Sequence, residues 1–429
     1  MAQALKTLEP TTSPLHFFGS EVRRLRQHLE MSQAELGRKL LHSKDLVGKI
    51  EAAQRVPSRD FVNRCDEILG AEGALRRMWP MLERERHLRA SKEPARPATA
   101  EAHFPEATDR PVLDWLLSPA GESRRHSFDQ DAAIDAADML LRLRQVDQVH
   151  GAGESYPDVA DFLRHSLQPL AVRAPNVAVG FLELAGYEAV DLGADGTAQQ
   201  HYLGALQIAT AGGERLYGGY IVGVSLAHLA LHCGAPSHAV RLATAALLGT
   251  ERCATPAVRA AFHIVLARSY ARLGDEGACT TALRQVETDL ERSRAADEPA
   301  WIAYFGEADL ADEKAHCFFD LGLHPLTQRE ARSAIDLLKP TRVRRLAIDT
   351  ALLASSLART GDIDEASWVA RQAVDHAANT ASFRSAHRIA LMTAEIHRYA
   401  DVRTAQDLAE YTRFRLPSIP TLSSGDRGR

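Results

Sequence analysis

Several common features are scarce or absent in this chain of 429 residues, and each absence excludes a class of protein. The five cysteines are widely spaced with no Cys-x-x-Cys pair, which predicts neither a disulfide framework nor a zinc knuckle. No apolar run approaches the roughly 18 residues of a membrane span; the best candidate, residues 220–231, is broken by Ser225 and His228. The first residues lack the basic patch and apolar core of a secretory signal. We therefore expect a protein of the reducing cytoplasm without membrane association.

Sequence signatures of catalysis are also missing. The chain has no phosphate-binding G-x-x-x-x-G-K loop and no G-x-S-x-G nucleophile elbow. His228 and His232 lie four residues apart beside Cys233, a spacing that can place two ligands on one metal ion. No third ligand is near in the sequence, so packed histidines are the preferred interpretation. We predict no enzyme activity, no catalytic residue, no cofactor and no metal.

Lysine is scarce, with 7 residues against 44 arginines, and charge is divided unevenly along the chain. Residues 1–90 hold 16 basic and 12 acidic side chains, for a net charge of +4, whereas residues 91–429 hold 35 and 44, for a net charge of −9. Lys39, Lys44 and Lys49 fall close together in the basic part. This division predicts that only the front of the chain contacts a polyanion such as nucleic acid.

Helical periodicity is dense over residues 14–89 and again over residues 128–415, with few alternating runs typical of strands. Residues 90–127 are rich in proline, alanine, serine and charge, and are predicted to form a linker. Within it, the apolar patch 112–117 is a candidate for a short docked helix. Residues 416–429 are predicted to be a disordered tail. The fold class expected is all-α.

Glycine recurs in the second helical zone at spacings of 39 to 48 residues, and a further break is expected near Ala400-Asp401. Glycine readily adopts the left-handed conformation that ends a helix. An alanine-rich segment follows the breaks, and small residues let paired helices approach closely. Helix pairs repeating every roughly 34 to 47 residues indicate an α-solenoid, here of about seven pairs. The glycines at these breaks are Gly151, Gly193, Gly234, Gly274, Gly322 and Gly361.

Two segments of this zone resemble tetratricopeptide repeats. LARSYARLGDEGACTTALRQ (residues 266–285) matches the pattern of Leu, Tyr, Leu-Gly and paired Ala, and LASSLARTGDIDEASWVARQAV (residues 353–374) matches it nearly as well. The resemblance covers roughly residues 130–415. It implies stacked helix pairs with a concave face and says little about function.

The sharpest pattern lies in residues 20–58, where apolar side chains recur at helical spacing. Ser32 followed by Glu35 predicts a capping box that starts the second helix. Ser43 is positioned to cap the third helix, and Pro57-Ser58 to stop the chain and cap the fourth. A fifth helix is predicted over residues 73–89. We expect a five-helix domain over residues 14–89.

This segment resembles the helix-turn-helix of the phage-repressor (Xre) family, without a gap over residues 31–58. It departs from the family at Leu41 in the turn and at Ala53 after the recognition helix, where glycine is usual. The resemblance implies an ion pair between Arg26 on the first helix and Glu51 on the third. That role is structural rather than a DNA contact.

The resemblance also implies which residues contact double-stranded DNA. The side-chain amide and helix N-terminus at Gln33 would bind a phosphate. Lysine can donate to guanine and aspartate can accept from cytosine in the major groove, whereas glycine permits close backbone approach. The alternative for the lysines is a solvated basic face. The DNA-binding residues expected are Gln33, Ser43, Lys44, Asp45, Gly48, Lys49 and Arg55.

Aromatic residues gather in the middle of the predicted solenoid. At helical spacing such residues are most often core, and the alternative is a concave ligand groove. Arg384 and Arg388, four residues apart, are candidates for an anion site, although a solvated face is the preferred interpretation. The candidate ligand-binding residues are Tyr217, Tyr220, Trp301, Tyr304 and Phe305.

A repressor-type reading head joined to tetratricopeptide-like repeats resembles the peptide-sensing regulators of Gram-positive bacteria and actinobacterial regulators of development or secondary metabolism. The resemblance implies a homodimeric transcriptional regulator on an inverted-repeat operator, with a peptide or small-metabolite effector. One alternative is an interaction scaffold or anti-activator that acts through the repeats. Another is a toxin–antitoxin or phage-type regulator. The operator, the effector and the sign of regulation stay open.

Overall fold

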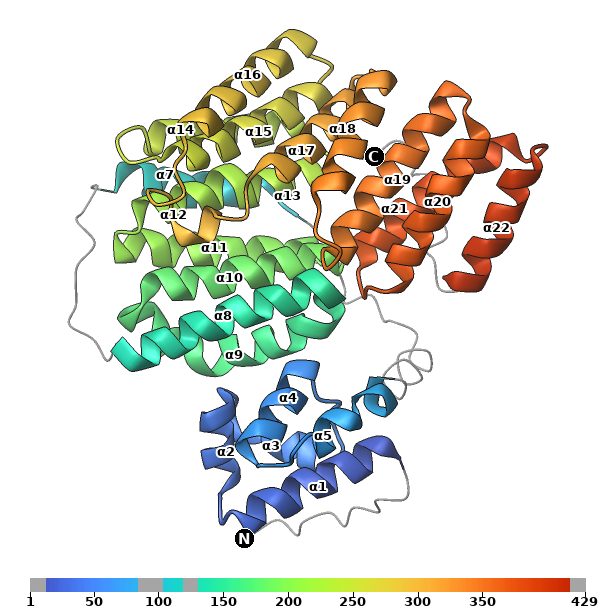
Figure 1. Ribbon diagram of the computed structural model, residues 1–429. Helices are drawn as coiled ribbons and strands as arrows, with labels where there is room; N and C mark the ends of the chain where they lie inside the picture. Colours follow the sequence, from blue (N-terminus) through green and yellow to red (C-terminus); the bar gives the residue numbers. More distant parts are fainter. Residues whose placement is uncertain (1–12, 84–102, 119–129, 417–429) are drawn as a thin grey trace. The chain divides into compact units, whose positions relative to one another are not determined.

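The computed structural model describes residues 13–83, 103–118 and 130–416, and in these residues the fold is all-α with no strand (Figure 1). The chain forms two compact units. Of the described residues, the first unit comprises 13–83, 134–141 and 157–169, and the second comprises 103–118, 130–133, 142–156 and 170–416. Of the predicted linker only residues 103–118 are described, and the predicted tail after Leu416 lies outside the described residues.

The N-terminal part of the first unit is a small bundle around a shared apolar core. Phe18, Leu36, Ile50 and Phe61 are all fully or almost fully buried in it. Its helices are α1 (Pro14–His28), α2 (Gln33–Leu40), α3 (Lys44–Glu51), α4 (Arg59–Ile68) and α5 (Ala74–Arg77).

The fifth helix is shorter than the prediction of one helix over residues 73–89. The helix breaks at Met78, and the chain is helical again over residues 79–83, the last described residues of this unit's N-terminal part. Pro80 has no N–H to donate to the carbonyl of Arg76, which accounts for the break.

The predicted helix starts in this bundle are confirmed. Ser32 and Glu35 form a reciprocal capping box on α2, and the hydroxyl oxygens of Ser43 and Ser58 each accept a backbone N–H in the first turn of α3 and α4. Leu41 and Ala53, where the resemblance predicted glycine, hold left-handed φ values of 57° and 55°. The turn geometry is therefore kept despite the side chains.

The second unit stacks helix pairs in chain order (Figure 1). Helices α8 and α9 contribute residues to both units. The elements are α8 (Gln130–His150), α9 (Ala152–Arg173), α10 (Pro175–Asp191), α11 (Asp195–Gly212), α12 (Arg215–Tyr220), the π-helical η2 (Ile221–Leu226), α13 (Ala227–His232), α14 (Pro236–Gly249), α15 (Pro256–Arg272), α16 (Glu276–Arg292), η3 (Ala300–Ile302), α17 (Glu307–Asp320), α18 (His324–Leu337), α19 (Val343–Thr360), α20 (Ile363–Ala378), α21 (Phe383–Ile396), η4 (His397–Tyr399) and α22 (Arg403–Arg415).

Glycine ends the first helix of most of these pairs, as the spacing predicted. All six break glycines have φ between 74° and 90°, the left-handed conformation that a side chain resists. With the break after η4, seven consecutive pairs lie within residues 130–415. The regular glycine spacing therefore reports the repeat length directly. No described helix is both long and apolar enough to cross a membrane.

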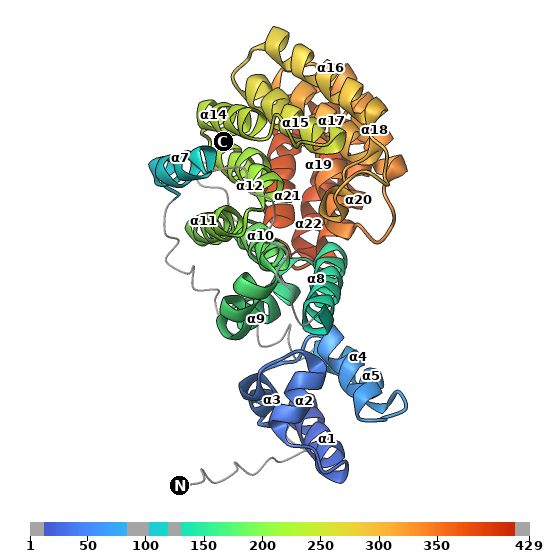
Figure 2. The same cartoon turned by 90° about the vertical axis from the view of Figure 1, so that its left-hand side faces the viewer.

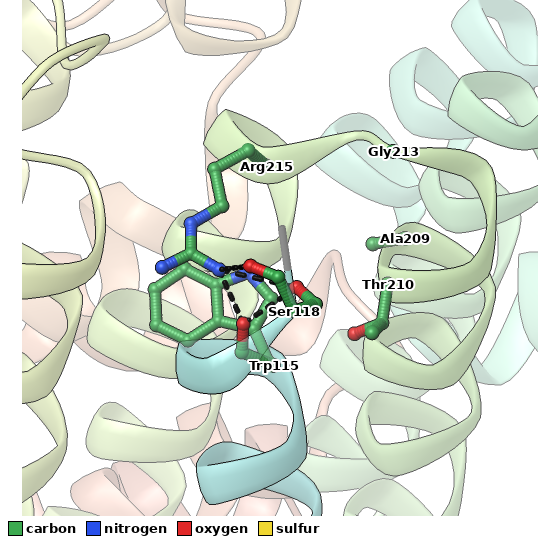
Figure 3. Close-up of a pocket in the computed structure, with 6 residues that line it drawn as sticks. All are labelled: Trp115, Ser118, Ala209, Thr210, Gly213 and Arg215. Carbon is green, nitrogen blue, oxygen red and sulfur yellow. Dashed lines mark hydrogen bonds between the residues drawn. The ribbon is translucent and has the colours of Figure 1, made fainter. Parts of the chain in front are cut away.

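The apolar patch at residues 112–117 does form a docked helix. The 3-10 turn η1 (Pro105–Thr108) leads into α7 (Asp109–Leu117), which packs beside α11 and α14 (Figure 2). Trp115 is fully buried, and the guanidinium of Arg215 lies 4.4 Å from its ring centroid (Figure 3). Glycine at 249 makes room, since a Cβ there would lie 2.3 Å from the indole.

Candidate nucleic-acid interface

The candidate interface is built on α2, α3 and the three-residue turn between them. Leu46, Val47 and Ile50 bury the inner face of α3, which leaves Lys44, Asp45 and Lys49 exposed. The close turn depends on Gly37, where a Cβ would lie 2.7 Å from the carbonyl oxygen of His42. The outer face of α3 thus consists of the side chains predicted to contact bases.

Two of the predicted base-contacting side chains pair with each other. Lys49 Nζ lies 2.7 Å from Asp45 Oδ2, one helical turn away, and both side chains are about half exposed or more. The Lys49 ammonium beside Asp45 holds the pKa of that carboxyl below its usual range. Lys44, at the first position of α3, is in no ion pair with a described residue. An exposed pair of this kind is weak and exchanges readily with other partners.

Gly48 lies on this face, and no packing contact within the protein requires a glycine there. A Cβ at this position would meet only the side chain of Gln33, at 3.5 Å, which is an ordinary contact. Glycine inside a helix costs about 0.5–1 kcal/mol relative to alanine. Because no neighbour in the bundle demands it, the absent side chain is consistent with close approach by an external partner.

A buried charge network joins the three helices behind this face. Arg26 Nη2 donates to Glu51 Oε2 at 2.9 Å, so the predicted ion pair between the first and third helices is confirmed. Glu51 is fully buried, and Arg23 Nη2 donates to its backbone oxygen at 2.9 Å. Breaking a buried pair of this kind is costly, because one charge is left without a partner. The network fixes α3 against α1.

Gln33 belongs to the same network, which the sequence did not reveal. Its Nε2 donates to Glu51 Oε2 at 2.8 Å, so one amide hydrogen is engaged inside the protein. Only the second amide hydrogen and the backbone N–H groups remain for a phosphate. The N–H groups of Gln33 and Ala34 open α2 and have no acceptor within the helix. Ala34 was missed because a backbone donor leaves no side-chain signal in a sequence.

The other two predicted phosphate contacts, Ser43 and Arg55, have carboxylate partners within the first unit. Ser43 Oγ donates to Asp161 Oδ2 at 3.2 Å while it also caps α3. Arg55 Nη2 lies 3.7 Å from Asp158 Oδ1. A phosphate would have to replace these acids at both side chains.

The aromatic residues proposed for ligand binding gather in one cluster of the second unit. The rings of Tyr217 and Trp301 stack with centroids 4.6 Å apart, and Tyr220 lies 4.9 Å from the same indole. The hydroxyl groups of Tyr220 and Tyr304 are 2.7 Å apart, and Phe305 lies edge-on to Tyr304. The rings therefore contact one another rather than surrounding an open space.

In the histidine pair at 228 and 232, and in the arginine pair at 384 and 388, the two side chains of each pair contact different groups. His232 Nε2 lies 3.4 Å from Asp195 Oδ1, while burial lowers the pKa of His228. Arg384 donates to Asp191 at 3.1 Å, so it is not on a solvated face. Arg388 lies over the ring of Phe319, 5.2 Å from the centroid.

Residues 18–79 match the family model of a helix-turn-helix domain. This match covers the whole of α2, the turn and α3. No curated protein matches the chain closely enough to count as a relative. The chain therefore contains the helix-turn-helix domain of a DNA-binding regulator.

Proposed function

We propose that the protein is a sequence-specific transcriptional regulator that binds double-stranded DNA with the outer face of α3. The observation that carries the proposal is the solvent-exposed set of Lys44, Asp45 and Lys49 on the second helix of a helix-turn-helix. The N-terminal N–H groups of α2, together with the second amide hydrogen of Gln33, supply the phosphate contact that sets the register. The net charge of +4 in residues 1–90 supports approach to DNA.

The whole chain would be used to select binding sites from a library of random DNA duplexes. Enrichment of one motif, followed by a gel shift with that duplex, would support the proposal. Binding that depends only on salt and not on sequence would contradict it. Arg77, exposed on α5, provides a control variant outside the proposed face.

We further propose that the regulator acts as a dimer held together by the helical repeats, on an inverted-repeat operator. A bundle of this size makes few base contacts, so two half-sites about one helical turn apart would raise affinity. Light scattering on residues 1–90 and on the whole chain separates the possibilities. A dimeric fragment, or a monomeric whole chain at micromolar concentration, would contradict the proposal.

The repeats between residues 181 and 319 are proposed to bind a peptide or small-metabolite effector near the Tyr217–Trp301 stack. Tyr304, which is 39% exposed, gives the cluster an edge that a ligand could reach. The net charge of −9 over residues 91–429 favours a cationic or neutral ligand.

Thermal-shift screening of peptide and metabolite fractions, followed by titration with and without operator, tests this proposal. An effector that lowers the affinity of the protein for DNA must itself bind more weakly when DNA is bound. The coupling free energy between two such sites is typically about 1–3 kcal/mol. Ligands that leave operator affinity unchanged would favour the interaction scaffold instead. Trp368, which is 64% exposed on α20, supports that second candidate because a large exposed apolar side chain suits a protein partner.

A further inference from the structure

Two helices of adjacent pairs bring three potential metal ligands together. Asp312 and His316 lie one turn apart on α17, and Asp349 lies on α19, which packs against α17. One ligand atom of each residue lies within 4.8 Å of the other two, and His316 Nε2 is 3.5 Å from Asp312 Oδ1. In the parts of the chain that are described, this is the one group of three such side chains with that geometry.

The charges around this group do not balance. Three buried aspartates share the single guanidinium of Arg345, at 3.0 Å from Asp309, 2.9 Å from Asp312 and 3.6 Å from Asp349. Glu313 does not change the count, because it pairs with Arg268. With all three carboxylates ionised, one guanidinium would leave two negative charges uncompensated in a buried site, and either a bound cation or protonation of a carboxyl must offset them.

Three carboxylate oxygens of this group have no hydrogen-bond partner. Asp312 Oδ1 and both oxygens of Asp349 are buried and accept no hydrogen bond. Asp349 is 1% exposed, so water does not satisfy it freely. Buried polar atoms are nearly always partnered, so an orphaned set requires an explanation, and a bound ion is one of those known.

The donor set suits a transition metal. The imidazole of His316 offers a nitrogen lone pair, and the two carboxylates supply negative charge that a divalent cation would neutralise.

We propose that Asp312, His316 and Asp349 bind one divalent transition-metal ion such as Zn²⁺. Zinc accepts carboxylate oxygen and imidazole nitrogen at about 2.0–2.2 Å, so small side-chain movements would close the observed spacing. The imidazole favours a transition metal over Mg²⁺ or Ca²⁺, which prefer oxygen ligands alone. Arg345 would act as the outer partner that orients both carboxylates.

Bound metal would join α17 to α19 and so connect two successive helix pairs. A cross-link of this kind would restrain the angle between the α17/α18 pair and the α19/α20 pair. The inference does not depend on DNA binding, and its test does not use DNA.

The test uses the whole chain after removal of metal by a chelator. Isothermal titration with Zn²⁺ and the visible absorption of added Co²⁺ report binding, while thermal unfolding reports the accompanying stabilisation. The variants are His316→Gln and Asp349→Asn, and circular dichroism checks that each is folded. His263→Gln is the matched control, because that ring also lies near an aspartate, 3.8 Å from Asp289 Oδ2, but without a third ligand.

We expect the wild-type chain and His263→Gln to bind one Zn²⁺ that His316→Gln and Asp349→Asn bind at least tenfold more weakly. The Zn²⁺-induced rise in unfolding temperature should disappear in the same two variants. Asp349→Asn removes a buried charge, so the metal-free variant should remain folded. Equal Zn²⁺ affinity in all four proteins, or no Zn²⁺ bound by the wild-type chain, would overturn the proposal.

Discussion

Arg344 and Asp147 form a two-point ion pair, with both N–O distances at 2.7 Å, although 197 residues separate them in the chain. Both side chains are at most 5% exposed. Arg344 also donates to Asp191 at 3.2 Å and to the hydroxyl oxygen of Tyr187 at 3.0 Å. Helices α8 and α10, near the start of the repeats, are thereby tied to α19 near their end.

Replacing this arginine should destabilise the second unit strongly. Arg344→Met leaves Asp147 and Asp191 buried without their shared cation, which should cost about 3–5 kcal/mol of unfolding free energy. Chemical denaturation followed by circular dichroism measures the loss. Arg332→Met is the control, because Arg332 pairs with Glu365 on the surface, and it should change stability by about 0.5 kcal/mol or less. Similar losses in the two variants would show that the buried pair is not special.

Truncating the anchor of α7 should release that helix. Trp115→Ala removes a fully buried indole and leaves Arg215 without the ring beneath it, at a cost of about 3–5 kcal/mol. Hydrogen exchange of the amides in α7 should accelerate more than exchange in α19. Leu117→Ala, at a side chain 74% exposed, should leave exchange unchanged. Undiminished protection of α7 in Trp115→Ala would mean that other contacts hold the helix.

Replacing a residue that has a left-handed backbone conformation by glycine should stabilise the first unit. Glu30 is exposed with a φ of 53°, a conformation that costs a non-glycine residue roughly 1–2 kcal/mol. Glu30→Gly should therefore gain about 0.5–1 kcal/mol of unfolding free energy after the entropy cost of glycine. Gln27→Gly, within α1, should lose about the same amount. The two variants should thus shift the denaturation midpoint in opposite directions.

Acid should weaken the second unit through His201. Burial lowers the pKa of this imidazole to about 4, and its Nε2 lies 3.2 Å from the Tyr156 hydroxyl oxygen. Between about pH 6.5 and pH 4 the unfolded chain takes up a proton that the folded chain does not, so stability falls as pH falls.

The slope from this one group should approach about 1.4 kcal/mol per pH unit in that window. His201→Gln should lose that part of the pH dependence in denaturation series between pH 7 and pH 4.5. His397→Gln, at an exposed imidazole, should keep the wild-type profile. Parallel profiles for the wild type and His201→Gln would refute the assignment.

Substitutions at the proposed base contacts and at the proposed phosphate contact should change DNA binding in different ways. Lys44→Ala and Lys49→Ala should each weaken binding to the selected site by about 1–3 kcal/mol and relax base preference at one position. Gln33→Ala should weaken all duplexes alike, but it also removes a hydrogen bond to Glu51, so its stability must be measured in parallel. Footprints unchanged in both lysine variants would show that α3 is not the recognition helix.

The sequence by itself determined the features that depend on a few neighbouring residues. Helical periodicity, the serine caps at Ser32 and Ser43, and the glycines that end the paired helices are local, because a helix start or stop needs only the residues around it. The docked helix at residues 112–117 was also visible as an isolated apolar patch. These local signals sufficed for the all-α fold and for the helix-turn-helix.

Only the tertiary structure decided which distant side chains meet. The side-chain amide of Gln33 donates to Glu51, and Arg384 donates to Asp191. The stacking of the helices sets both pairings, and no short-range periodicity in the sequence encodes them. The ligands proposed for metal lie on α17 and α19, so only two of the three, Asp312 and His316, share a recognisable spacing. A contact between helices depends on how their side chains pack, and packing is a property of the assembled fold.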